Sequence, residues 1–139
     1  MFRLHERLAA DTLQVEDWEL CRVRLMNDSR FPWLILVPRR TDLMDIDQLA
    51  GPDKALLQTE MGWAYRVLRE ATHPFKLNVA ALGNQVRQLH IHVIARFEDD
   101  AAWPAPVWGV GTPTPYSVRE GEHFVRRLKL AIRAARSLA

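Results

Sequence analysis

The sequence is poor in cysteine and in long apolar runs. Cys21 is the only cysteine, so intramolecular disulfides and cysteine-based zinc clusters are excluded. The start of the chain lacks the continuous apolar core of a signal peptide. No apolar run approaches the roughly 20 residues that a membrane span needs. We therefore expect a cytoplasmic protein with no membrane contact.

The chain also lacks an excess of charge of one sign. Its 139 residues carry a formal net charge of +2, so we expect no nucleic-acid partner. With 48% apolar residues the chain can form a proper core, and its length fits a single domain over residues 1–139. A small anionic ligand is compatible with this composition, because the field at a site depends on local placement rather than on net charge.

The first half of the sequence predicts a hairpin followed by a helix. Residues 13–26 have a mixed, β-like pattern, residues 27–32 supply turn residues, and residues 33–37 have the pattern of a buried strand. From about residue 51 to 71 the period becomes helical. One apolar stripe there is formed by Leu57, Met61, Ala64, Tyr65 and Leu68.

The second half predicts further strands and a second helix. Residues 76–82 and about 86–97 are typical of strands, joined by a tight turn at Gly83–Asn84. A proline-rich loop begins at about residue 99. It leads to a helix over residues 122–138, whose apolar face holds Phe124, Leu128, Ala131, Ile132, Ala135 and Leu138. Together these elements predict an α+β fold with about five strands in an antiparallel sheet and two main helices.

The strand over residues 86–97 carries two histidines two positions apart. Because side chains alternate on a strand, one face holds Leu89, Ile91, Val93 and Ala95, and the other holds Gln88, His90, His92, Ile94 and Arg96. The first set predicts a core face, and the second is a row of hydrogen-bonding and cationic groups. Alternation alone leaves catalysis, metal binding and an ordinary water-facing surface open.

A metal site would need more ligands than this row offers, because zinc normally takes at least three protein ligands. The other histidines are His5, His73 and His123, and none of them has a spacing typical of metal ligands. We expect these three to be surface or capping residues. We expect no metal and no cofactor.

An anion site has more support. Asn84 and Gln85 come just before the histidines, and their amides can donate to phosphate oxygens. Backbone N–H groups at Gly83–Asn84 can also point outward, although an ordinary hairpin turn would use the same residues. A neutral histidine beside such donors can attack phosphorus and form a phosphoramidate.

The segment around the two histidines resembles a known motif. The stretch "QLHIHVI" is similar to the motif of the histidine triad (HIT) family, His-φ-His-φ-His-φ-φ with φ hydrophobic, with Gln88 in place of the first histidine. The preceding "GNQVR" resembles the family's Gly-Gln-Ser/Thr-Val segment, and "RLMNDSRFPWLILVPRR" resembles its first hairpin. The resemblance covers roughly residues 23–97 and indicates a divergent, bacterial-type branch. It implies a five-stranded antiparallel sheet with helices, commonly in a homodimer.

The resemblance also implies a chemistry. Family members are hydrolases and transferases that act on the α-phosphate of nucleotides, for example in dinucleoside polyphosphates. By position, His90 would be the nucleophile that becomes nucleotidylated. His92 would donate to a phosphate oxygen or orient the substrate, and Gln88 would supply a further donor in the catalytic row.

The same comparison suggests residues that bind the substrate. Asn84 would hold the phosphate near the nucleophile, with Gln85 as another donor. Asn78 would contact sugar or phosphate. Asn27 would bind the ribose hydroxyls, or Asp28 if the alignment shifts by one residue.

Departures from the family pattern keep a second function open. Gln88 cannot carry a proton charge near pH 7, and Trp33 and Thr41 stand where relatives often have histidine. His90 and His92 favour preserved covalent chemistry. The alternatives are a nucleotide-binding or sensing module with weakened catalysis, and a metalloprotein that uses the two histidines.

The loop after the histidine strand contains two large aromatic residues. Trp103 and Trp108 either form the leaving-group wall of the pocket or stack on a base, or they pin the loop to the sheet or to a dimer partner. Trp33 has similar options, in the core or at the wall of the site.

Overall fold

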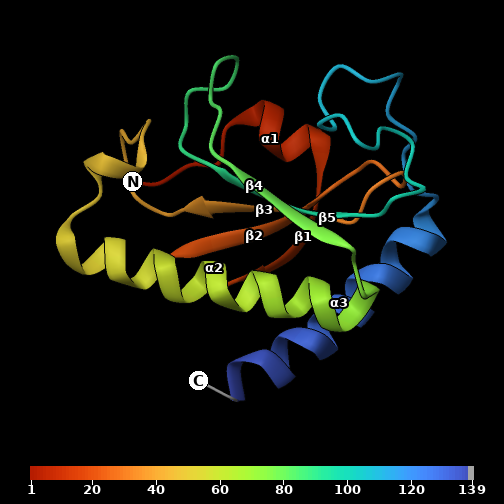
Figure 1. Ribbon diagram of the computed structural model, residues 1–139. Coiled ribbons are helices and arrows are strands. Elements are labelled where there is room, and N and C mark those ends of the chain that lie inside the picture. Colours follow the sequence, from red (N-terminus) through yellow and green to blue (C-terminus); the bar gives the residue numbers. More distant parts are fainter. Residues whose placement is uncertain (138–139) are drawn as a thin grey trace.

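The computed structural model describes residues 1–137, and its centre is one antiparallel β-sheet (Figure 1). The strands are β1 (Thr12–Asp17), β2 (Cys21–Met26), β3 (Trp33–Pro38), β4 (Lys76–Ala80) and β5 (Ile91–Arg96), in the order β1-β2-β3-β5-β4. The helices are α1 (Glu6–Asp11), α2 (Gly51–Thr72) and α3 (Val118–Ser137), with a short 3-10 helix, η1 (Ile46–Gln48), before α2. The predicted α+β fold with a five-stranded antiparallel sheet is confirmed.

The β-like stretch over residues 13–26 contains both β1 and β2. In β2 every second side chain is buried, as expected for a strand with one face on the core: Cys21, Val23 and Leu25. A side chain of α2 binds the turn between β1 and β2. There the fully buried carboxylate of Glu60 accepts hydrogen bonds from the backbone N–H groups of Leu20 and Cys21, each 2.8 Å long.

The two faces of the sheet are covered differently (Figure 1). α2 and α3 pack on one face, where the core includes Leu89, Ile91, Val93 and Ala95, as the alternation predicts. α1 and the long loops cover the other face, where a smaller cluster holds Leu8, Phe31, Trp33, Ile35, Val37, Val86, Ile94, Ala102 and Val107. His92 and Arg96 are therefore buried under this second layer rather than exposed to water.

The two long helices bury the predicted stripes. In α2 the stripe is buried except for the half-buried Tyr65. α3 begins at Val118 rather than at residue 122, because Ser117 and Glu120 form a capping pair: the Ser117 hydroxyl accepts from the Glu120 N–H at 3.1 Å and donates to its carboxylate at 2.9 Å. Leu138, predicted for the apolar face of α3, lies outside the described residues.

The predicted tight hairpin at Gly83–Asn84 is wrong. Residues 81–90 form an irregular connection, and β5 begins at Ile91 rather than near residue 86. The segment pairs with other parts of the chain instead of with β4, since the Leu89 N–H donates to the Leu43 carbonyl at 2.9 Å. Gln88 and His90 consequently lie before the strand.

The short helix α1 was not predicted from the sequence. His5 caps it, because its Nδ1 accepts from the Arg7 N–H at 3.0 Å. His73 is the C-terminal cap of α2 with a left-handed φ of 51°, and His123 is exposed on α3. The expectation of capping and surface histidines is confirmed. Among the helices of residues 1–137, none is long and apolar enough to cross a membrane.

Candidate active site

His90 and His92 face a common cavity of about 350 Å³ on the side of the sheet that α1 covers. Elements far apart in the sequence form its walls. They contribute Arg7, Leu8 and Asp11 from α1, Met26 from β2, Trp33 and Ile35 from β3, Leu82, Gly83, Asn84, Gln85 and Val86 from the connection before β5, and Trp108. The structure thus brings His90, His92, Asn84 and Gln85 together.

The position of the His90 ring fixes which nitrogen can act as a nucleophile. Its Nδ1 lies 2.7 Å from the carbonyl oxygen of Gln88. A carbonyl only accepts, so Nδ1 carries the proton and Nε2 keeps its lone pair. Burial lowers the pKa of His90 below 6.5. The bond to Gln88 opposes that effect and the nearby His5 adds to it. His90 is therefore neutral near pH 7, as an attacking imidazole must be.

His92 is held in the opposite tautomer. The indole Nε1–H of Trp33 donates to its Nδ1 at 2.9 Å, and an indole can only donate. In neutral His92 the proton therefore lies on Nε2, which can donate to a ligand. Burial, with a smaller effect of His90, lowers the pKa of His92 to about 3. The two imidazole rings meet edge to face with centroids 4.9 Å apart, and both line the same cavity.

The connection before β5 adds amide donors. Gly83 has a φ of +69°, a conformation that side chains with a Cβ rarely adopt, and the exposed Asn84 and Gln85 follow it. Within residues 1–137 neither amide forms a side-chain hydrogen bond to protein. Both are therefore free to donate to an anion in the cavity.

The comparisons with known proteins agree with this geometry. A family model described as the HIT domain matches residues 7–99. The chain belongs to the histidine triad family. This is a family of nucleotide-binding and nucleotide-hydrolysing proteins. No curated protein matches the chain.

Solved HIT structures extend the match over nearly the whole chain. A histidine triad protein from Sinorhizobium meliloti is 46% identical, with a TM-score of 0.92 over 94% of this chain and 97% of the other. One from Marinobacter aquaeolei is 42% identical, with a TM-score of 0.91 over 97% and 98%. A more distant protein, described as a hypothetical histidine triad nucleotide-binding protein from Sulfolobus tokodaii, shares 15% identity and a TM-score of 0.66 over 88% and 85%, which shows the fold alone.

Gln88, which the sequence comparison assigned to the place of the first triad histidine, has its side chain outside the cavity. Its amide oxygen accepts from the His5 N–H, and its amide nitrogen donates to the Arg3 carbonyl, each at 2.8 Å. Its side chain is thus bound to the N-terminal segment. Only its main-chain carbonyl reaches a triad residue.

Asn78 is likewise held away from the triad. Its side-chain oxygen accepts from Arg96 at 2.8 Å. Arg96 is buried and also forms an ion pair with Asp100 at 2.8 Å. Asn78 therefore belongs to a network that holds the loop after β5.

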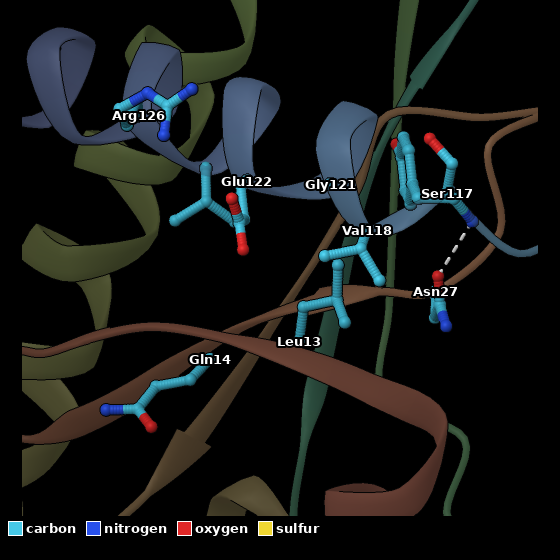
Figure 2. A pocket seen from close by; sticks show the side chains of 10 residues that line it. Leu13, Gln14, Asn27, Ser117, Val118, Gly121, Glu122 and Arg126 are labelled. Atoms are coloured by element: carbon cyan, nitrogen blue, oxygen red, sulfur yellow. Dashed lines mark hydrogen bonds between the residues drawn. The ribbon is translucent and has the colours of Figure 1, made fainter.

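Asn27 and Asp28 also form contacts elsewhere. Asn27 accepts from the Tyr116 N–H at 2.9 Å in a separate cavity of about 500 Å³ between β1 and the start of α3 (Figure 2). Asp28 is buried, pairs with Arg30 at 2.8 Å and accepts from the Thr114 N–H at 3.2 Å. The structure does not bring Asn27, Asp28 or Asn78 to the histidines.

The tryptophans divide between the two predicted roles. Trp108 lines the cavity and packs edge-on against His92 at 5.1 Å, and the buried Trp33 belongs to both the core and the wall. Trp103 packs against Phe75 at 5.4 Å and so pins the loop.

The wall that α1 and its neighbours supply was not predicted from the sequence. Leu8 and Met26 give the cavity an apolar side, and the exposed Arg7 and Asp11 lie near each other at 3.6 Å. A six-residue helix is too short to show a helical period, so α1 gave no pattern to detect. Alternation along β2 is the one signal that could have pointed to Met26 on the face opposite the core.

Proposed function

We propose that this HIT protein is a nucleotide hydrolase or nucleotidyl transferase that attacks the α-phosphate of a nucleotide conjugate through His90. The observation that carries the proposal is the hydrogen bond from His90 Nδ1 to the Gln88 carbonyl. It leaves the Nε2 lone pair as the nucleophile in a cavity that also holds neutral donors. A dinucleoside polyphosphate is the substrate class that we favour.

The reaction takes two displacement steps. His90 Nε2 attacks the α-phosphorus, a P–N bond forms, and the P–O bond to the leaving group breaks with the electron pair on the departing oxygen. His92 Nε2–H and the amides of Asn84 and Gln85 donate to the phosphoryl oxygens as charge develops. Water, or another acceptor in a transferase, then attacks phosphorus and releases His90.

The cavity walls suit the nucleoside part of such a substrate. Leu8, Met26 and Ile35 provide apolar surface for a base, and the Asp11 carboxylate can accept hydrogen bonds from ribose hydroxyls. We assign the ribose to Asp11 in preference to Asn27 or Asp28, because Asp11 lines the cavity of the histidines, whereas the other two side chains form their contacts elsewhere.

A turnover screen tests the proposal. Wild type and His90→Ala would be compared on dinucleoside polyphosphates, nucleoside phosphoramidates and other nucleotide conjugates, with circular dichroism to check folding. We expect turnover by wild type and a loss of at least about a thousandfold in His90→Ala. Wild-type rates in a folded His90→Ala variant would exclude His90 as the nucleophile.

One observation favours a second candidate, a nucleotide-binding or sensing module with weakened catalysis. The side chain at the first triad position is an amide already bound to Arg3 and His5, so it cannot deliver a proton to a leaving group. This candidate predicts nucleotide binding by calorimetry with no turnover across the panel.

A further inference from the structure

Gln88 links the N-terminal segment of the chain to the nucleophile. Its main-chain carbonyl accepts from His90 Nδ1 at 2.7 Å. Its side chain binds the main chain of the segment Arg3–His5, 83 to 85 residues away in the sequence. The same residue therefore holds the His90 ring on one side and the entry to α1 on the other.

The carboxamide of Gln88 matches the backbone that it binds. In an extended segment the carbonyl of one residue and the N–H two residues later point to the same side, as Arg3 and His5 do here. A carboxamide presents an acceptor and a donor next to each other, so it binds this pair as a neighbouring strand would. An imidazole carries its two nitrogens on different sides of a ring and cannot form both bonds at once.

The bound segment leads directly into a wall of the cavity. His5 caps α1, and α1 supplies Arg7, Leu8 and Asp11 to the cavity of the triad. The C-terminal end of α1 is held separately, by the hydrogen bond from the Asn27 N–H to the Asp11 carbonyl at 3.0 Å. The Gln88 side chain secures the other end.

We propose that Gln88 is a positioning residue that fixes the α1 wall of the active site by binding the main chain of Arg3 and His5. This inference rests on the proposed function. When these bonds are lost, α1 is in place for only part of the time, so the substrate binds more weakly in proportion. His90 keeps its carbonyl partner, because that partner is main chain, and the chemical step is retained.

Steady-state kinetics of Gln88→Ala and Gln88→His test this role. We expect KM to rise about tenfold in both variants, the effect of losing roughly two exposed hydrogen bonds, while kcat stays within about threefold. A rise in kcat in Gln88→His would overturn the proposal, since it would show that a histidine at this position contributes to the chemical step. A fall in kcat at unchanged KM in Gln88→Ala would also overturn it.

A matched pair at His5 isolates the main-chain bond. His5→Ala removes the cap but keeps the N–H that Gln88 binds. His5→Pro removes both, and the φ of −56° at this position already suits proline. We expect His5→Pro to raise KM beyond His5→Ala, and Gln88→Ala to add less in the His5→Pro background than in wild type, because only its bond to Arg3 is left to lose. Fully additive effects would contradict the linkage.

Hydrogen exchange separates this inference from the proposed function. The backbone amides of residues 3–8 should exchange faster in Gln88→Ala than in wild type, whether or not the protein turns over a nucleotide. If wild type shows no turnover, the proposed function fails, and the exchange rates with the dissociation constant for a dinucleoside polyphosphate still test the inference. Unchanged exchange in Gln88→Ala would contradict it.

Discussion

At the scale of single residues, the two triad imidazoles differ because their neighbours differ. His90 donates to a carbonyl, and His92 accepts from an indole. Neither neighbour carries a charge, so the tautomers are set by hydrogen-bonding capacity alone. Trp33 is thereby part of the site's electrostatics rather than a simple space-filling residue.

Trp33→Phe should show this contribution. The substitution leaves Nδ1 of the buried His92 without its donor and frees the ring to exchange tautomers. We expect kcat to fall about tenfold with the fold retained, since a lost hydrogen bond of this kind is worth about 1–2 kcal/mol. Trp108→Phe is the control, because Trp108 packs on the same ring. An equal fall in kcat in both variants would assign the effect to packing instead.

The pH dependence of activity follows from the lowered pKa values of His90 and His92. Both rings must be neutral in the proposed reaction. Because burial lowers the pKa of His90, the acid-side fall of kcat/KM for a dinucleoside polyphosphate should occur at a lower pH than the titration of an ordinary histidine. An acid limb with a midpoint at or above 6.5 in the rate profile would contradict this assignment.

At the scale of elements, the sequence predicted β5 and its core face but not where the strand begins. Alternation identified Leu89, Ile91, Val93 and Ala95 as one face, which depends only on the local period. The start depends on partners that are distant in the sequence, since Leu89 pairs with Leu43 and Gln88 with the N-terminal segment. Asn84 and Gln85 could be placed near the histidines because they are close to them in the sequence. The α1 wall could not be predicted, because α1 is far from the histidines in the sequence.

The loop after β5 depends on a buried ion pair. The side chains of Arg96 and Asp100 are 1% and 4% exposed, and Asp100 also accepts from the N–H groups of Phe97, Ala102 and Trp103. Asp100→Ala should lower the free energy of unfolding by about 3 kcal/mol or more, because it leaves Arg96 buried without its partner. Urea unfolding would measure this, with the exposed Asp99→Ala as control. A loss no larger than that of the control would show that the pair does not hold the loop.

At the scale of the whole molecule, length and composition predicted a single domain, and the pattern of strands and helices predicted its α+β fold. The histidine row, with the segments before it, indicated the family. These sequence features did not determine whether chains of this protein associate with one another. β4 is the last strand in the sheet order, and apolar side chains are exposed on and beside it: Phe75, Val79 and Leu82 at 61%, 43% and 46%. Exposed apolar edge strands tend to pair with another chain.

We therefore predict a homodimer that uses the β4 edge. Val79→Lys should convert it to a monomer, because a charge on the shared edge would be buried without a partner. Light scattering after size exclusion would measure the mass. Val118→Lys, at a position 80% exposed on α3, is the control and should leave the dimer intact. A monomeric wild type, or a dimeric Val79→Lys variant, would contradict the prediction.

The central claim is that Nε2 of His90 forms a bond to phosphorus. Its most direct test is peptide mapping by mass spectrometry after rapid mixing with a dinucleoside polyphosphate, under conditions that avoid acid because P–N bonds hydrolyse there. We predict a nucleotidyl group on His90, with no adduct in the His90→Ala protein. An adduct on another residue, or turnover with no adduct at any time point, would contradict the account.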